Sequence, residues 1–348
     1  MNIKKRFKIS NTWVGGQQDS CFIIAEAGSN HNRDFETAKK LIDVAKDAGA
    51  DAVKFQTYSA ETLYPKNKEP LRLIGETVKP FDVIKAIELP REWHKPLAQY
   101  AKSKGLYFMS TPFDKEAIDQ LAPLMPAIKW ASPELIDRPL LEYAAKKKKP
   151  LIIYTGFYSL KEVKEALQWI EKTGNNQVTL LQCTALYPTK FEDVNLRAMM
   201  TMQKKFGLSV GLSDHTMSTV IPAAAVAMGA RVIEKHFTLS RKSKGPDHSF
   251  ALEPDELKEM VDNIRDVEKS LGNGIKKPVP KESAKEKLIT RGIMATRDLE
   301  KGKKITPEDI TTKRVGEGAI LPKYYKHILG RKLIINVKTD QKITWEMI

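Results

Sequence analysis

Short apolar runs recur along the first three quarters of the chain, and nearly every run ends at a polar or ionisable side chain. The runs occupy residues 22–25, 52–53, 106–109, 127–128, 151–154, 178–181, 208–212 and 232–233. Their length and composition are typical of strands that are covered on both faces. The side chains at their ends include Glu26, Lys54, Thr111, His215 and His236. Because catalytic groups gather at the C-terminal ends of the strands in a (β/α)8 barrel, the pattern predicts an α/β enzyme of this fold.

Segments with helical periodicity separate these runs. Asp34 is placed to cap one helix, Ser159 and Glu162 form a capping-box pattern before another, and Pro254 stands at a first helical position. Strand and helix in alternation predict a parallel sheet with helices outside it. Eight predicted strands favour a closed barrel over an open doubly wound sheet. The long gap between Tyr58 and Glu88 predicts an insertion or mobile loop near the active face.

The pattern changes after Gly272, which divides the chain into three predicted parts. Residues 1–272 form the barrel, residues 273–284 have a Gly/Pro/Lys linker composition, and residues 285–348 form a small domain. Four β-type runs, at 293–295, 304–306, 332–337 and 343–344, indicate that this small domain is β-rich. A domain of about 60 residues has a thin core, so we expect it to pack on a partner.

Composition narrows the class of protein. With 348 residues and 41% hydrophobic residues, the chain can build a large core, and its two cysteines offer no disulfide framework. No apolar signal segment follows the basic N-terminus and no run is long enough to span a bilayer, so we expect a cytoplasmic protein without a membrane partner. The net charge of +15 suits anionic small substrates, and without aromatic-interleaved basic motifs we expect no nucleic-acid partner.

His215 and His236 follow consecutive strands, so a barrel would bring both imidazoles to one rim. Imidazole nitrogen together with oxygen donors suits a divalent ion such as Mn, Fe, Co or Zn. The alternative is a pair of hydrogen-bonded rim histidines without a metal.

Two lysines at strand ends, Lys54 and Lys129, would be costly to bury unless each faced an anion. Hydroxyl donors accompany them at Ser110, Thr111, Ser132 and Ser213, so the rim is suited to phosphate or carboxylate. The alternative is that either lysine only pairs with Glu26 or Glu134. These two carboxylates and Asp247 are candidates for proton transfer, although Asp247, in a Gly/Pro loop, is equally well explained as a turn residue.

Several motifs, in order along nearly the whole chain, resemble the sialic acid synthase family. They are IAEAGSNHN at 24–32, VKFQT at 53–57, STPFD at 110–114, KWASPE at 129–134, QCT at 182–184 followed by Tyr187-Pro188, GLSDH at 211–215, EKHFT at 234–238 and KGPDH at 244–248. The tail motif TKRVG at 312–316 resembles the antifreeze-like (SAF) domain attached to these synthases.

The resemblance implies an N-acetylneuraminate synthase, which condenses phosphoenolpyruvate with N-acetylmannosamine and water and releases phosphate. His215 and His236 would hold a divalent metal, for which we expect Mn²⁺ with Mg²⁺ or Co²⁺ as alternatives, and Glu26 would reach a metal-bound water. Phosphoenolpyruvate would contact Lys54, Thr111, Lys129, Ser132 and Ser213, and the sugar would contact Gln56, Tyr187, Asp247 and Glu134. Arg314 would reach the sugar from the second chain of a domain-swapped homodimer.

Two positions depart from the family pattern. Ala185 stands where some relatives carry Asn or Ser, which removes a phosphoenolpyruvate contact or passes it to backbone or water. Leu288 stands at a position that is aromatic in some relatives and changes the wall of the sugar pocket.

Three other functions remain open at this point. A sister synthase that makes legionaminic or pseudaminic acid, or that accepts a phosphorylated sugar, would share the chemistry and differ only in the sugar pocket. A metal-dependent barrel hydrolase would need more His or Asp ligands than the pair seen here. In a non-catalytic protein the tail would bind ice or glycans, which the polar rim of the barrel argues against.

Overall fold

The computed structural model describes residues 3–73 and 76–348, which form two compact units. The first unit spans residues 1–272 and the second spans residues 273–348. Residues 74–75, within the predicted insertion, lie outside the described part.

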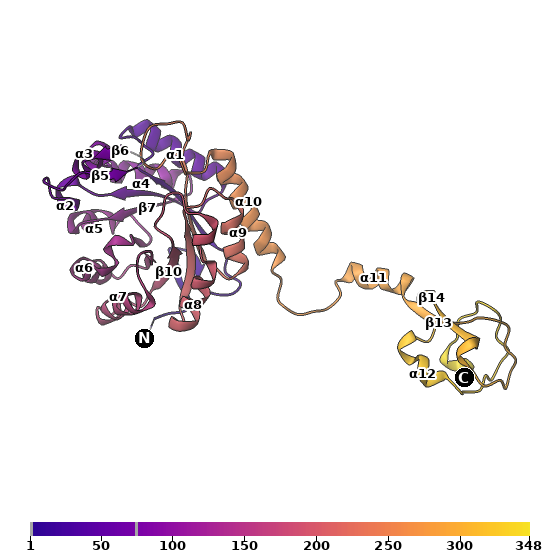
Figure 1. The fold of residues 1–348 in the computed structure, drawn as a ribbon. Helices are drawn as coiled ribbons and strands as arrows, with labels where there is room; N and C mark the ends of the chain where they lie inside the picture. The colour runs from indigo at the N-terminus through magenta and orange to yellow at the C-terminus, as the bar shows by residue number, and fades with distance from the viewer. Residues whose placement is uncertain (1–2, 74–75) are drawn as a thin grey trace. The chain divides into compact units, whose positions relative to one another are not determined.

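Eight parallel strands form the sheet of the first unit (Figure 1). They are β3 (Phe22–Gly28), β4 (Ala52–Thr57), β7 (Tyr107–Pro112), β8 (Ile128–Trp130), β9 (Leu151–Tyr154), β10 (Val178–Cys183), β11 (Ser209–Asp214) and β12 (Val232–His236). The strand order is β7-β4-β3-β12-β11-β10-β9-β8, and β7 and β8, at the two ends of this order, also contact each other. The sheet is therefore a nearly closed barrel. All eight predicted runs overlap these strands, three of them starting one residue before the strand, which confirms the predicted fold and excludes the open doubly wound sheet.

A helix follows every strand of the barrel. The helices are α1 (Phe35–Ala48), α4 (His94–Ser103), α5 (Lys115–Leu121), α6 (Arg138–Lys146), α7 (Leu160–Lys172), α8 (Leu196–Phe206), α9 (Val220–Ala227) and α10 (Pro254–Ser270). The predicted caps are present: the Asp34 side chain accepts from the Thr37 amide, and Ser159 and Glu162 form a capping box. None of the helices in the described residues has the length and apolar character needed to cross a membrane.

Side chains alternate between the two faces of each strand, and this alternation separates two cores. Ile23 and Val53 point outward and pack in the cluster that includes apolar residues of the helices. Phe22, Ile24 and Ala52 point inward and pack inside the barrel. Two residues further along, the same inward series continues with Glu26 on β3 and Lys54 on β4, which are also buried. The strands are therefore apolar near their N-terminal ends and polar near their C-terminal ends.

Two additions modify the barrel. An antiparallel hairpin of β1 (Phe7–Ile9) and β2 (Thr12–Val14) contributes apolar side chains to the inner core at the N-terminal ends of the strands. The gap between β4 and α4 contains α2 (Ala60–Leu63), the β5–β6 hairpin (Leu71–Leu73 and Glu76–Val78) and α3 (Pro80–Ile87), so the predicted insertion is present.

The second unit has less regular strand structure than the sequence predicts. Its strands are β13 (Arg291–Ala295) and β14 (Ile310–Arg314), which pair antiparallel, and its helices are α11 (Pro280–Ile289) and α12 (Tyr325–Ile328). The predicted runs at 304–306, 332–337 and 343–344 are not strands: Lys304 and Lys332 form one isolated bridge, Val337 belongs to another, and residues 343–344 belong to none. The predicted linker is also too long: Pro280 starts α11 at a position where a missing N–H costs nothing. Apolar side chains such as Ile293, Ile305 and Val337 nevertheless form a separate core.

Candidate active site

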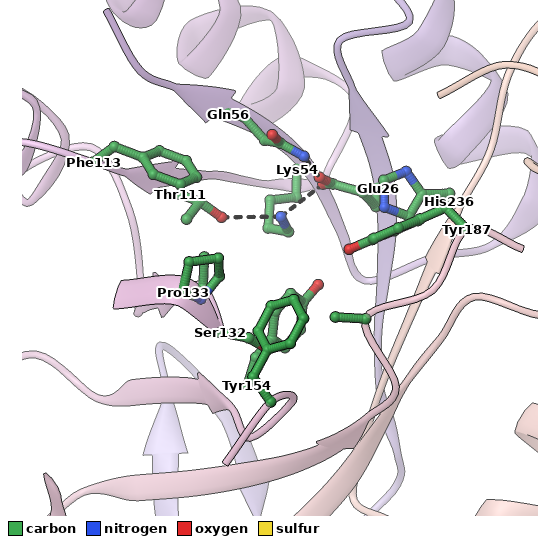
Figure 2. A pocket seen from close by; sticks show the side chains of 13 residues that line it. Glu26, Lys54, Gln56, Thr111, Phe113, Ser132, Pro133, Tyr154, Tyr187 and His236 are labelled. Carbon is green, nitrogen blue, oxygen red and sulfur yellow. Dashed lines mark hydrogen bonds and ion pairs between the residues drawn. The ribbon is translucent and has the colours of Figure 1, made fainter. Parts of the chain in front are cut away.

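Strand register brings the predicted polar side chains together at the C-terminal end of the barrel. His236 on β12 pairs with Glu26 on β3, and Glu26 pairs with Lys54 on β4. A cavity of about 190 Å³ lies over these residues. Seven predicted site residues line it, namely Glu26, Lys54, Gln56, Thr111, Ser132, Tyr187 and His236 (Figure 2). Ala185 lines it as well, so the departure from the family pattern lies within the site.

Lys54 is the centre of a buried ionic network. Its Nζ lies 2.8 Å from Glu26 Oε2 and donates to Thr111 Oγ1 at 3.0 Å, as the dashed lines in Figure 2 show. Burial alone would lower the pKa of Lys54, but the nearby carboxylates of Glu234 and Glu26 outweigh it and raise the pKa. Lys54 is therefore a permanent cation at the pocket wall, and it pairs with Glu26 as the alternative interpretation of the sequence expected.

Glu234 was not among the predicted site residues. Its carboxylate lies between the two lysines, with Oε1 3.3 Å from Lys54 Nζ and Oε2 3.9 Å from Lys129 Nζ. Both contacts are ion pairs without a hydrogen bond, and among the described residues neither carboxylate oxygen of Glu234 has a hydrogen-bond partner. The motif at 234–238 contains Glu234, and alternation along β12 places it on the same inward face as Val232 and His236.

Lys129 has a different environment from Lys54. Its Nζ lies 2.8 Å from the centroid of the Tyr154 ring and donates to the Trp130 carbonyl at 3.2 Å. Burial lowers the pKa of Lys129 to about 7, against the opposing effect of Glu234. Glu234 is nearly 4 Å away and Glu134 is not in contact, so little offsets the cost of burying the charge of Lys129. A bound anion would stabilise the charged form of this lysine.

The two predicted metal ligands are close together and neutral. The ring centroids of His215 and His236 lie 5.5 Å apart, and the Tyr187 ring lies 4.2 Å from that of His215. His215 Nδ1 lies 2.8 Å from the Thr184 carbonyl, which can only accept, so Nδ1 carries the proton and Nε2 keeps its lone pair. Burial lowers the pKa of His215 to about 4 and that of His236 well below its usual value. Neutral imidazole is the form that binds metals.

The donor set fits a divalent ion held by two protein side chains. His236 Nδ1 is buried and has no hydrogen-bond partner among the described residues. No group of three or more His, Cys, Asp or Glu in the described part of the chain is arranged to hold a metal. The remaining ligands of an ion bound by His215 and His236 would therefore be water or substrate, which leaves open positions of the kind that catalytic metal sites keep.

The three predicted catalytic carboxylates have different positions. Glu26 lines the cavity, accepts from Gln56 Nε2 at 2.8 Å, and has a pKa raised to about 7 by burial, in part offset by Lys54. Asp247 Oδ2 accepts from the Ser29 amide at 3.2 Å, and burial raises the pKa of this carboxyl group. Neither Asp247 nor Glu134 is among the cavity residues, although Pro133, the neighbour of Glu134, is. The pKa of Glu134 is raised to about 7, mainly by burial and also by the nearby charge of Asp137.

Gly28 explains how Asp247 reaches the edge of the cavity. Gly28 has a φ of +52°, and a Cβ at this position would lie 2.6 Å from Asp247 Oδ2 and 3.5 Å from both Gln56 Nε2 and Glu26 Oε1. Three polar groups therefore lie around the position that a side chain of residue 28 would fill. Asp247 can approach Gln56 and Glu26 only because residue 28 is glycine.

The remaining predicted residues lie next to the cavity or in the second unit. Ser213 Oγ lies 3.3 Å from His215 Nε2, whereas Ser132, which lines the cavity, accepts from the Gly156 amide at 3.1 Å through its Oγ. Arg314 ends β14 in the second unit, where it is exposed. Leu288, on α11 of the same unit, is 77% exposed.

Comparisons with family models, with known sequences and with solved structures all identify the same family of proteins. Residues 41–276 match the NeuB family and residues 290–348 match the SAF domain. The chain is 43% identical to the N,N'-diacetyllegionaminic acid synthase of Legionella pneumophila, over 98% of both chains, and 36% identical to the human N-acetylneuraminate-9-phosphate synthase, over 97% of this chain and 94% of the human one. The crystal structure of the N-acetylneuraminic acid synthetase of Leptospira borgpetersenii superposes with a TM-score of 0.74 at 33% identity, over 82% of this chain and 96% of that one.

Proposed function

Because this chain belongs to the NeuB family, we propose that it condenses phosphoenolpyruvate with a 2,4-diacetamido hexose to form a diacetylated nonulosonic acid. NeuB family synthases are phosphoenolpyruvate-dependent transferases that form a carbon–carbon bond, and this chain is such an enzyme. The observation that carries the choice of sugar is the 43% identity to a synthase named for N,N'-diacetyllegionaminic acid, against 36% to the human enzyme. N-Acetylmannosamine, the sugar that the motifs first implied, is the second candidate.

The cavity supplies the groups that phosphoenolpyruvate requires. Its phosphate and carboxylate would meet Lys54, Thr111 and Ser132, which line the cavity. Lys129, whose Nζ lies over the ring of the lining residue Tyr154, and Ser213 would complete the contacts from behind this lining. Because burial opposes the charged form of Lys129, an anion bound next to it would stabilise that charge. The lysines would also hold phosphoenolpyruvate in one orientation toward the sugar, which lowers the entropic barrier to the reaction.

The chemistry then follows a balanced sequence. The enol carbon of phosphoenolpyruvate attacks the aldehyde carbon of the open-chain sugar, and a C–C bond forms. Water adds to the resulting cationic C2, and phosphate leaves with cleavage of the C–O bond. The Glu26 carboxyl group lines the cavity with a pKa of about 7, so near neutral pH it can take the proton of this water and deliver it to the alkoxide oxygen that the aldehyde becomes. The C2 hydroxyl then loses its proton to the departing phosphate as the C2 carbonyl forms. A divalent ion held by His215 and His236, which we propose to be Mn²⁺, would supply Lewis-acid polarisation of the aldehyde oxygen.

The quaternary arrangement belongs to the same proposal. We infer a domain-swapped homodimer in which Arg314 of one chain reaches the cavity of the other. In support, no residue of α11 is buried among the described residues, and its apolar Leu288 and Ile289 are exposed. Such a helix is expected to have a partner surface. The proposed compartment is the cytoplasm, where phosphoenolpyruvate is available.

The test is turnover with a panel of sugars. The purified protein, phosphoenolpyruvate and Mn²⁺ are incubated with 2,4-diacetamido hexoses or with N-acetylmannosamine, and the products are identified by mass spectrometry. We expect the highest kcat/KM with a diacetamido sugar and phosphate release only when both substrates are present. Higher kcat/KM with N-acetylmannosamine would replace the proposed sugar, and phosphate release without any sugar would indicate a hydrolase.

A further inference from the structure

One buried histidine connects the two loops that flank the sugar end of the cavity. His248 is 3% exposed and follows Asp247 directly in the loop after β12. Its Nδ1 lies 2.6 Å from Thr238 Oγ1, at the start of the same loop. Its Nε2 lies 3.2 Å from Asn32 Oδ1, in the loop after β3. The imidazole therefore joins the beginning of one loop to a second loop on the neighbouring strand.

The hydrogen-bond partners specify the state of this ring. Because the Asn32 carbonyl oxygen can only accept, His248 Nε2 must carry the proton and donate to it. The bare Nδ1 then accepts from the Thr238 hydroxyl. Burial lowers the pKa of His248, which favours the same neutral form. Each nitrogen has one partner of the matching kind, so the ring is held in a single orientation.

The fold leaves little room for any other arrangement of this segment. A Cβ at Gly245 would lie 2.7 Å from His248 Cδ2 and 3.0 Å from Asn32 Oδ1. The backbone before Asp247 therefore packs directly against the imidazole and its partner. On the other side of Asp247, the Ser29 amide donates to its Oδ2. The loop after β3 thus anchors both members of the Asp247–His248 pair.

We propose that His248 is a positioning residue that holds the Asp247 carboxylate at the sugar-binding edge of the cavity. It does not line the cavity itself, and it acts through Asp247 by locking the loop that carries this residue. The inference rests on the proposed function in one respect, namely that Asp247 contacts the sugar. It predicts an effect on the KM for the sugar and not on the KM for phosphoenolpyruvate, whose proposed contacts lie on β4, β7, β8 and β11 and at Ser132 directly after β8.

Kinetics of the His248→Ala variant provide the first test. Loss of two hydrogen bonds should raise the KM for the sugar roughly tenfold and leave the KM for phosphoenolpyruvate within about twofold of wild type. In the Asp247→Asn background the same substitution should have little further effect, since the residue through which it acts is already altered. The control is His94→Ala, which removes another buried histidine bonded to a threonine hydroxyl, and whose effect should add to that of Asp247→Asn. Additive effects of His248→Ala and Asp247→Asn would overturn the proposal.

The crystal structure of the His248→Ala variant provides a second test that requires no activity. We expect Asp247 Oδ2 to move away from the Ser29 amide, and an unchanged contact at 3.2 Å would overturn the proposal. His248→Gln can restore the bond to Asn32, and His248→Asn the bond to Thr238, so each should recover part of the sugar KM. If the wild-type protein turns over none of the sugars, the proposed function fails, whereas the crystallographic result still decides the positioning role.

Discussion

The Lys54 ammonium lies 2.8 Å from the Glu26 carboxylate, and both side chains are about 1% exposed. Removing one member of such a pair leaves the other charged and buried without compensation. We therefore expect Lys54→Met to lower the free energy of unfolding by about 3–5 kcal/mol. It should also weaken phosphoenolpyruvate binding by about 10- to 100-fold, because a charged donor is lost. Urea denaturation and equilibrium binding measure the two effects.

The matched control is the double variant Lys54→Met/Glu26→Gln. It should recover part of the lost stability, because the stranded carboxylate is gone, but none of the phosphoenolpyruvate affinity. Recovery of affinity in the double variant would show that Lys54 serves Glu26 and not the substrate.

His236→Ala tests the proposed metal site. With one of two imidazole ligands absent, Mn²⁺ affinity should fall by more than about 100-fold, since even residues behind the ligands contribute 10- to 100-fold. Electron paramagnetic resonance of free Mn²⁺ measures this directly, and His327→Ala on α12 of the second unit is the control. Wild-type turnover that persists unchanged in metal-free buffer would contradict the Lewis-acid role.

The raised pKa of Glu134 makes the free energy of unfolding depend on pH in a specific way. Burial raises its pKa from 4.5 to about 7, so the folded protein binds this proton more tightly than the unfolded chain does. The stabilisation is present below the unfolded pKa and is lost as the pH rises through about 7. Glu134→Gln cannot ionise, so relative to wild type it should gain up to about 3 kcal/mol between about pH 5 and about pH 8. Parallel pH profiles of unfolding for the two proteins would refute the assignment.

Subunit complementation tests the swapped arrangement of Arg314. Arg314→Ala should raise the sugar KM, and His236→Ala should abolish metal-dependent turnover. If Arg314 acts across the dimer, co-expression of the two variants creates heterodimers in which one cavity has both an intact metal site and a partner arginine. Activity should therefore reappear in the mixture. Purified heterodimers with no more activity than the parents would place Arg314 in its own chain's site or outside any site.

The barrel and most of the site could be predicted because both follow from alternation along single strands. Glu26, Lys54 and His236 each extend an inward series that begins with apolar residues, so a strand prediction is also a prediction of which face they occupy. Glu234 and Tyr154 were missed for a different reason. Their importance comes from contacts with Lys129, which depend on how separate strands come together.

Two other differences between the sequence-based predictions and the structure have local causes. Glu134 belongs to a family-like motif, but Pro133 starts a 3-10 turn directly after Ser132, and it is Pro133 that lines the cavity. In the second unit, short apolar runs indicate burial correctly, since Ile305 and Val337 are core residues. They do not indicate strands, because a single bridge can bury a residue without a continuous ladder.

The N-terminal hairpin has a consequence for the order of events in turnover. Phe7, Ile9 and Val14 pack into the barrel interior at the N-terminal ends of the strands, so the interior is accessible only from the C-terminal ends. If phosphoenolpyruvate binds at Lys54 and Lys129 as proposed, we expect it to enter the barrel before the sugar. Closure of one end of the barrel would then order the entry of the two reactants at the other end.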